Sequence, residues 1–296
     1  MGEELKQRIL PNVADGSLKL CFALTEPNAG TNSFRIETLA KKDAAKGFYR
    51  INGQKVFITG ADVADKMLLV TRTTTLKECQ EQGRSKTYGL SLFLVDTRAE
   101  GVTLTELQAR GIEGFREFTI YLEDVQVPAE DLVGEENGGA AALFSSLNPE
   151  RIVATGFAVG NTEYWLKRAI EYARERVVFS GKPIGSHQAI AHPLAELKIE
   201  LEAVRMLARR AAWSFDQGHD PARVGFWANC AKHKAGDLVV NAVDQAIQTF
   251  GCYGFADEYG IIQLWESARL LRTAPVTREM ILNFVSEHVL NLPRSY

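Results

Sequence analysis

The sequence has few of the residues from which metal centres and disulfide frameworks are built. Its 296 residues include four cysteines and five histidines, and neither type shows metal-ligand or C-x-x-C spacing. The cysteines are therefore expected to be reduced thiols in a reducing compartment, and no metal site is predicted. A G-x-S-x-G elbow and a P-loop are also missing, so two common signatures of catalytic and nucleotide-binding sites are not present.

Long apolar runs and a strong charge imbalance are missing as well. No apolar run approaches the roughly 20 residues that a membrane span needs. The net charge of −3 gives no reason to expect nucleic acid or an anionic membrane as a partner. The first residues, MGEELKQRILPN, are charged and lack the apolar stretch of a signal peptide. The expected location is the cytoplasm of a bacterium, or the mitochondrial matrix if the source is eukaryotic.

The first half of the chain has the pattern of a β domain. Between about residues 18 and 133, short runs rich in Val, Ile, Phe, Tyr and Thr alternate with turn residues. The runs are LKLCFALTEP, FYRINGQKVFITG, KMLLVTRT, YGLSLFLVDT and EFTIYLEDVQVP. The pair Asn52-Gly53 predicts a tight hairpin turn between apolar runs, and the polar segment 75–87 predicts an exposed loop.

The second half has the pattern of a helical bundle. Apolar residues recur at helical spacing, as in Leu194, Leu197 and Leu201. Helices are predicted over roughly 137–176, 186–217, 221–250 and 277–290, with a shorter element near 258–271, and Gly218 and Gly251 lie where helices should end. The predicted fold class is α+β: a small antiparallel β-barrel or sandwich over residues 17–135, followed by a C-terminal four-helix bundle over residues 136–296.

Two segments of the β region have a structural and a functional interpretation. TEPNAGTN, residues 25–32, has the composition of a turn. Hydroxyls and backbone N–H groups at the end of a strand are also suited to hold the edge of a flat heteroaromatic ring. Phe57-Ile58-Thr59 repeats this combination of aromatic, aliphatic and hydroxyl side chains. The residues alone leave both interpretations open.

Two segments of the helical region are equally ambiguous. Arg176 and Phe179 fit a cationic helix end followed by a loop, but they also fit an arginine that pairs with a phosphate and an aromatic that stacks on a ring. Gln248 and Gly251 fit a glycine-capped helix end as well as a binding turn.

LNPERIVATGFAVG, residues 147–160, places an acid two residues into what resembles a helix start. Asn148 is a good N-cap, Pro149 suits the first helical position, and Glu150 would be a first-turn acid. Such an acid is stabilised by the helix dipole by roughly 0.3–1 kcal/mol. Its alternative role is that of a catalytic base.

Taken together and in order, these segments closely resemble the acyl-CoA dehydrogenase family of flavoproteins. The matching segments are CFALTEPNAGTN, INGQKVFITG, LNPERIVATGFAVG, the Arg-x-x-Phe segment followed by HQAI, QTFGCYGF and LLRTAPVTREMI. The resemblance implies bound FAD, oxidation of an acyl-CoA thioester to trans-2-enoyl-CoA, and an electron-transfer flavoprotein as electron acceptor. It also implies a homodimer or homotetramer, since an FAD site of that family uses two subunits.

The resemblance assigns further roles position by position. The positions that line the flavin correspond to Phe22, Leu24, Thr25, Phe57 and Thr59. The positions that reach the FAD of a neighbouring subunit correspond to Arg176, Phe179 and Gln188. Those near the adenosine half of that cofactor correspond to Gln248 and Gly251. The threonine near the cofactor in the terminal motif corresponds to Thr277. The substrate-side positions correspond to Thr31, Asn148 and Arg151.

One departure from the family pattern concerns the base. In many members the base is the glutamate of a terminal E-G-T motif, and the equivalent position here is Pro275, which cannot take a proton. In the isovaleryl and long-chain branches the base lies in an E-R pair at the start of the first helix of the bundle. The matching pair here is Glu150-Arg151, so the resemblance implies Glu150 as the base.

A second departure concerns the N-terminus. Residues 1–16 resemble the end of the N-terminal helical domain of the family, so most of that domain is expected to be missing. This leaves a second interpretation open: a non-catalytic or flavin-poor subunit that supports a partner in a hetero-oligomer. A third is a flavin-dependent monooxygenase on the same scaffold, which the E-R pair favours less.

Overall fold

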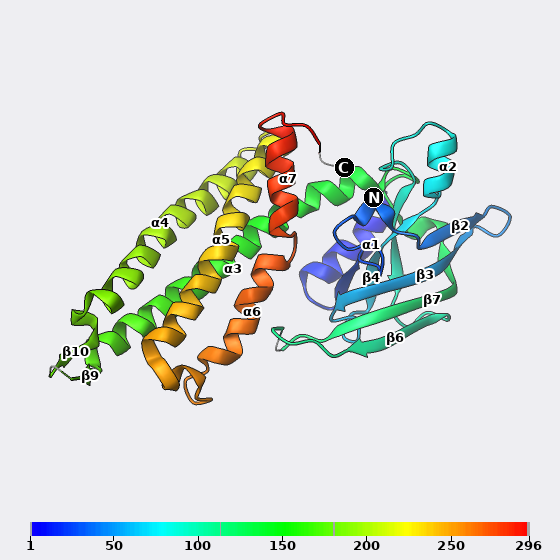
Figure 1. Ribbon diagram of the computed structural model, residues 1–296. Coiled ribbons are helices and arrows are strands. Elements are labelled where there is room, and N and C mark those ends of the chain that lie inside the picture. The colour runs from blue at the N-terminus through cyan, green and yellow to red at the C-terminus, as the bar shows by residue number, and fades with distance from the viewer. Residues whose placement is uncertain (1, 113, 180, 295–296) are drawn as a thin grey trace. The chain divides into compact units, whose positions relative to one another are not determined.

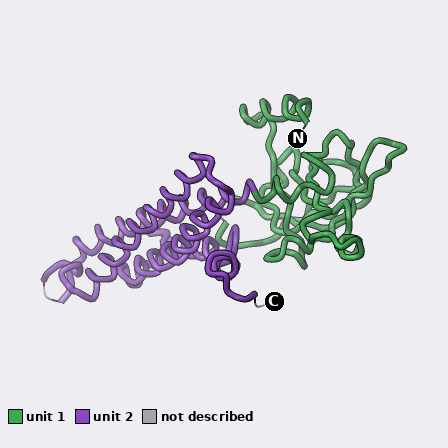
Figure 2. The backbone as a smooth tube through the Cα atoms, turned by 90° about the horizontal axis from the view of Figure 1, so that it is seen from above, with its two compact units in different colours: residues 1–144 green, residues 145–296 purple. Residues whose placement is uncertain are grey.

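The computed structural model describes residues 2–112, 114–179 and 181–294 (Figure 1). The chain forms two compact units, residues 1–144 and residues 145–296 (Figure 2). A mainly β unit is followed by a helical one, which confirms the predicted α+β fold class. The boundary between the units falls inside one helix, α3 (Gly139–Glu175), about one turn and a half after its start. None of the described helices is both long enough and apolar enough to span a membrane.

The first unit is built on one eight-stranded sheet. The strands follow the order β6-β7-β3-β2-β4-β5-β8, and β1 pairs with β4. Figure 1 shows β6, β7, β3 and β2 side by side. Most pairs are antiparallel, as expected, but β1–β4 and β2–β4 are parallel, which the sequence did not indicate. The strands are β1 (Leu20–Ala23), β2 (Leu39–Asp43), β3 (Phe48–Thr59), β4 (Lys66–Arg72), β5 (Leu90–Asp96), β6 (Val102–Leu107), β7 (Glu117–Pro128) and β8 (Leu132–Val133).

Burial explains which runs became central strands. β4 and β5 are almost continuously buried, whereas β3 and the second half of β7 alternate between buried and exposed positions. The main core of the unit gathers around Tyr49 and Phe93, whose ring centroids are 4.7 Å apart. Helix α1 (Glu3–Ala14) packs Leu5 and Ile9 against Leu94. The sheet is therefore held by apolar contacts of the kind that the β-branched and aromatic runs predicted.

Two local predictions in this unit are wrong. Asn52 and Gly53 do not form a hairpin turn, because they lie inside β3, next to an irregularity in its pairing with β7. Gly53 is required there by a close approach of the backbone at Thr38, not by a turn. The polar segment 75–87 is not all loop: it contains the short helix α2 (Leu76–Glu81), whose start carries a capping box between Thr75 and Glu78.

The second unit consists of helices that pack side by side (Figure 1). They are the rest of α3, α4 (Gln188–Asp216), α5 (Pro221–Phe250), α6 (Ile261–Thr273) and α7 (Arg278–His288). These bounds agree closely with the predicted helices, and Gly251 caps α5 with a φ of 62°. The core is lined by small and apolar residues, and α5 is buried along most of its length. A short hairpin of β9 (Val177–Val178) and β10 (Lys182–Pro183) joins α3 to α4.

We predict that Gly53→Ala destabilises the β unit. A Cβ at this position would lie 2.7 Å from the Thr38 Cα, inside van der Waals contact with backbone that cannot move aside. Overpacking of this kind costs about 1–3 kcal/mol, so the urea midpoint should fall. Gly30→Ala is the matched control, because its nearest neighbour would be 3.9 Å away. Equal midpoints for the two variants would contradict the prediction.

Candidate functional site

In the first unit, the ends of β1 and β3 lie next to each other. The Val56 N–H donates to the Thr25 carbonyl over 2.9 Å, which brings Leu24 and Thr25 beside the Val56–Phe57 segment. The two motifs that the sequence singled out in this unit are therefore neighbours in space. The expected turn is also present, since Glu26 and Ala29 exchange backbone hydrogen bonds.

Apolar side chains are exposed at this edge of the sheet. Phe57 is 60% exposed and Phe22 is 38% exposed. Phe57 also has a φ of 56°, an unfavourable backbone conformation for a bulky residue. Strain of this kind is kept where the surroundings fix it, and functional sites are common among such places. An exposed and strained aromatic beside a hydroxyl-bearing loop offers a face on which a planar ring can stack.

Thr59 ends β3 opposite a buried carboxylate. Its hydroxyl donates to Glu117 Oε1 over 2.6 Å, while Glu117 Oε2 is buried without a hydrogen-bond partner among the described residues. Because its proton is committed to Glu117, the Thr59 oxygen can only accept a further hydrogen bond. Thr31 lies exposed in the loop that follows Ala29.

A buried ion pair supports this edge, and the sequence interpretation missed it. Lys55 Nζ lies 2.8 Å from Glu26 Oε1, and Lys55 is fully buried. Burial lowers the pKa of Lys55 to about 8, which Glu26 partly opposes. Burial would raise the pKa of Glu26, but Lys55 and nearby hydrogen bonds hold it below its ordinary value. The alternation of Tyr49 and Ile51 in β3 already places Lys55 on the inward face, which is the signal that could have revealed it.

In the second unit, Glu150 lies inside a helix and not at its start. α3 begins at Gly139, about three turns earlier, and Pro149 is an interior proline. The predicted N-cap role of Asn148 is therefore wrong, and so is the N1 role of Pro149. The Asn148 side chain does not cap a helix start: its Nδ2 donates to the Pro221 carbonyl at the start of α5. Stabilisation of Glu150 by a nearby helix N-terminus does not apply, since that effect is confined to the first turn.

The Glu150 carboxylate has unusual electrostatics for a helix surface. None of the described residues forms a hydrogen bond or an ion pair with this carboxylate, and Glu150 as a whole residue is exposed. Its carboxyl is nevertheless partly dehydrated, which raises the pKa of Glu150 above its ordinary value, while the charge of Arg151 opposes the shift. A carboxylate that is held free of partners and is more basic than usual is suited to accept a proton.

Polar residues of three segments surround the helix near Glu150. Arg151 donates to Asn148 Oδ1 over 3.1 Å, and Gly225 in α5 packs so closely on Asn148 that a Cβ there would lie 3.3 Å from this oxygen. Lys232, also in α5, is buried and donates to the Val276 carbonyl. Burial, helped by the charge of Arg151, lowers the pKa of Lys232 to about 8.

The segment after α6 shows what replaces the family glutamate. Pro275 is exposed and Val276 is tied to Lys232. Thr277, predicted to lie near the cofactor, is the N-cap of α7, and its hydroxyl accepts from the Met280 N–H. Its cofactor role stays a prediction.

The remaining candidates lie at the other end of the helical unit. Arg176 follows the last turn of α3, Phe179 lies in the β9–β10 hairpin, and Gln188 begins α4. Gln248 and Gly251 end α5, whose Phe250 stacks on Tyr172 of α3 with ring centroids 4.2 Å apart. All five predicted residues are exposed, and Phe179 fully so, with a φ of 45°. Along α3, this end of the helical unit is remote from Glu150.

Comparison with known proteins decides the family. Residues 21–125 match the acyl-CoA dehydrogenase middle domain, and residues 137–290 match the acyl-CoA dehydrogenase C-terminal domain. The chain belongs to the acyl-CoA dehydrogenase family.

Individual relatives agree with this assignment. The chain is 43% identical to the acyl-CoA dehydrogenase FadE12 of Mycobacterium tuberculosis over 294 residues, which cover 99% of this chain and 73% of the relative. It is 32% identical to the caffeyl-CoA reductase–Etf complex subunit CarC of Acetobacterium woodii, covering 90% of this chain and 67% of the relative. The butyryl-CoA dehydrogenase structure of Megasphaera elsdenii is 31% identical and superimposes with a TM-score of 0.90, covering 98% of this chain and 72% of that one.

The acyl-CoA dehydrogenase family is FAD-dependent, and the residues of this chain fit such a cofactor. The exposed rings of Phe57 and Phe22 offer apolar faces for a flavin, and Thr25 and Thr59 offer hydroxyls at its edge. Arg176 is an exposed cation of the type that pairs with phosphate. Among residues 2–112, 114–179 and 181–294, no three His, Cys, Asp or Glu side chains are grouped as metal ligands.

We predict that Lys232 makes stability rise with pH in the alkaline range. Its folded-state pKa of about 8 lies below its ordinary value of 10.5, so the unfolded chain binds more protons between these two values. In this window the free energy of unfolding should increase by up to about 1.4 kcal/mol per pH unit relative to Lys232→Met, which cannot titrate. Urea denaturation of both proteins at several pH values measures this difference. Parallel pH profiles would refute it.

Proposed function

We propose that the protein dehydrogenates an acyl-CoA thioester between its α and β carbons, with Glu150 as the base. The observation that carries the proposal is the state of this carboxylate. It lies in the interior of α3, lacks hydrogen-bond and ion-pair partners among the described residues, and has a raised pKa. The other family position for a base is Pro275, which cannot accept a proton.

The chemistry assigns a distinct task to each group of residues. Glu150 takes the α-proton of the thioester, and a raised pKa makes it a stronger acceptor near neutral pH. Arg151 limits that rise, so the carboxylate stays ionised and ready. When bound, FAD supplies the acceptor for the β-hydride. Leu24, Thr25, Phe57 and Thr59 orient this cofactor, while Thr31, Asn148 and Arg151 contact the substrate.

The proposed electron acceptor is an electron-transfer flavoprotein. Its support is the relation to CarC, which is named as part of a complex with such a protein. The expected cytoplasmic location stays a prediction.

We predict that Glu150→Gln abolishes dehydrogenation but not cofactor binding. Purified wild-type protein should carry a flavin spectrum that bleaches anaerobically with a suitable acyl-CoA. Without the base, the rate of bleaching should fall about 10²- to 10⁴-fold, because proton abstraction loses its acceptor. Glu163→Gln is the control, since Glu163 lies exposed on the same helix and pairs with Arg205.

Two results would contradict this assignment. Wild-type bleaching rates in Glu150→Gln would remove Glu150 from the role of base. A wild-type protein that binds no FAD and copurifies with a second chain would support the supporting-subunit interpretation in place of catalysis.

We further propose that Arg176, Phe179, Gln188, Gln248 and Gly251 serve the FAD of a second copy of the chain. Between Glu150 and Arg176 the helix α3 is continuous, so a rise of 1.5 Å per residue separates them by about 40 Å. Arg176 therefore cannot contact the part of a cofactor that lies next to Glu150 of the same chain. A symmetric oligomer solves this problem by supplying these residues from its partner.

We predict that two inactive variants restore each other in a mixed oligomer. In a dimer of Glu150→Gln and Arg176→Ala chains, one site would combine an intact Glu150 with an intact Arg176 from the other copy. Random pairing should return about a quarter of the wild-type sites, measured as bleaching rate after co-expression with different tags. Mixing separately purified homo-oligomers without exchange of chains is the control. No recovery in isolated mixed oligomers would contradict the proposal.

A further inference from the structure

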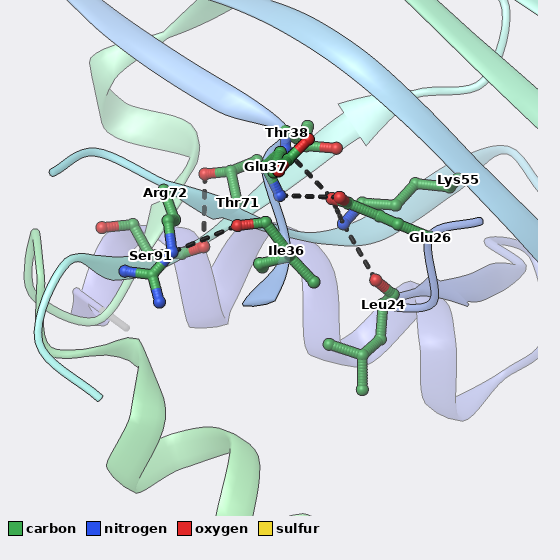
Figure 3. Close-up of polar contacts among 9 residues, drawn as sticks. All are labelled: Leu24, Glu26, Ile36, Glu37, Thr38, Lys55, Thr71, Arg72 and Ser91. Carbon is green, nitrogen blue, oxygen red and sulfur yellow. Dashed lines mark hydrogen bonds and ion pairs between the residues drawn. The ribbon is translucent and has the colours of Figure 1, made fainter. Parts of the chain in front are cut away.

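The loop 24–38 of the first unit has little regular structure but is fixed by buried charges. It connects β1 to β2 and contains only one short 3₁₀ turn, Ser33–Arg35. Loops of this kind are normally mobile, since few of their backbone groups are paired. Here two buried cations, Lys55 from β3 and Arg72 from β4, donate hydrogen bonds to backbone carbonyls of the loop (Figure 3).

The first anchor joins the start of the loop to its end. Lys55 Nζ donates to the Leu24 carbonyl over 2.9 Å and to the Glu26 carboxylate over 2.8 Å. The same carboxylate accepts the Glu37 N–H over 2.6 Å and the Thr38 N–H over 3.0 Å (Figure 3). One buried ion pair therefore closes the loop as a ring and holds the carbonyl that precedes Thr25.

The second anchor holds the middle of the loop from another strand. Arg72 is 2% exposed and donates to the Phe34 carbonyl over 2.6 Å and to the Ile36 carbonyl over 3.1 Å. Its remaining hydrogen bonds go to the carbonyls of the following segment, at Thr74, Lys86 and Tyr88. Arg72 thus fixes the residues just after Thr31 and has no acidic partner at hydrogen-bond distance among the described side chains.

Stability alone does not explain these charges. Removing two ions from water costs several kcal/mol each, and replacing a buried pair with apolar residues of similar volume is often neutral or stabilising. The charged groups add directional hydrogen bonds. Each of these bonds fixes the position of one particular carbonyl or N–H group. A loop that carries contact residues benefits from such fixed positions more than from additional apolar burial.

We propose that the two anchors are positioning elements with separate tasks: the Lys55–Glu26 pair places Leu24 and Thr25 for the flavin, and Arg72 places Thr31 for the substrate. The inference rests on the proposed function of these three contact residues. It assigns a role to Glu26, Lys55 and Arg72, none of which needs to touch the cofactor or the substrate.

The first test separates the two tasks. Glu26→Gln keeps the shape of the side chain but removes the charge that holds Lys55, so the Kd for FAD should rise about tenfold, with a changed flavin spectrum. Arg72→Lys keeps the charge but cannot reach all the carbonyls, so KM for acyl-CoA should rise about fivefold with little change in FAD affinity. Similar effects of both variants on both quantities would overturn the division of tasks.

A control variant separates positioning from a general loss of stability. Val125→Ala creates a small cavity in the core of the same sheet, in β7 opposite Ile51 of β3, and should cost about 1–3 kcal/mol. It should leave FAD affinity and KM near wild-type values. If Val125→Ala changes them as much as Glu26→Gln does, the ion pair has only a structural role and the proposal fails. The double variant Glu26→Gln/Lys55→Met, which buries no unpaired charge, replaces Glu26→Gln if the single variant does not fold.

Hydrogen exchange gives a readout that requires no cofactor. The Glu37 and Thr38 amides donate to Glu26, so their exchange in the apoprotein should become at least about tenfold faster in the double variant, and in Val125→Ala it should not. Unchanged exchange would overturn the anchor itself. If the wild-type chain binds no FAD at all, the proposed function fails, and this exchange experiment still decides whether the ion pair holds the loop.

Discussion

A helix that is continuous over 37 residues cannot bring its two ends together, and this constraint separates the candidate residues that α3 carries. Glu150 lies about a third of the way along α3, and Arg176 directly follows its last turn. The helical rise fixes their separation whatever the surrounding packing. Residues that resemble parts of one family site therefore lie about 40 Å apart along one helix.

The first unit meets a different constraint, which is the cost of placing charge in a protein interior. Lys55 and Arg72 are among the most buried side chains of the chain, yet every polar group that they reach belongs to a loop or a neighbouring segment. Buried donors without hydrogen-bond partners would be costly. The loop therefore takes the conformation that supplies acceptors to the N–H groups of both cations. The chain thereby converts an irregular segment into a defined surface beside the exposed rings of Phe22 and Phe57.

Glu150 shows how tertiary structure can overturn a sound local argument. Asn-Pro-Glu is a good helix start by propensity, but Gly139 begins the helix and Asn148 bonds to the first residue of α5. Tertiary contacts of this kind outweigh the roughly 1 kcal/mol at stake in a cap. Once the helix continues upstream, dipole stabilisation no longer accounts for an acid at this position. Its raised pKa then comes from lost hydration, the condition that a base requires.

The sequence by itself determined the α+β class, the bounds of the long helices and the family, because periodicity and ordered motifs are local properties that packing preserves. It also placed the candidate contacts at the ends of β1 and β3 and at the end of α5. Only the tertiary structure decided that Gly53 faces Thr38, that β1 pairs in parallel with β4, and that Lys55 and Glu26 meet across 29 positions of sequence. These features depend on which distant segments approach each other. Alternation along β3 can assign Lys55 to the inward face, but it cannot identify Glu26 as its partner.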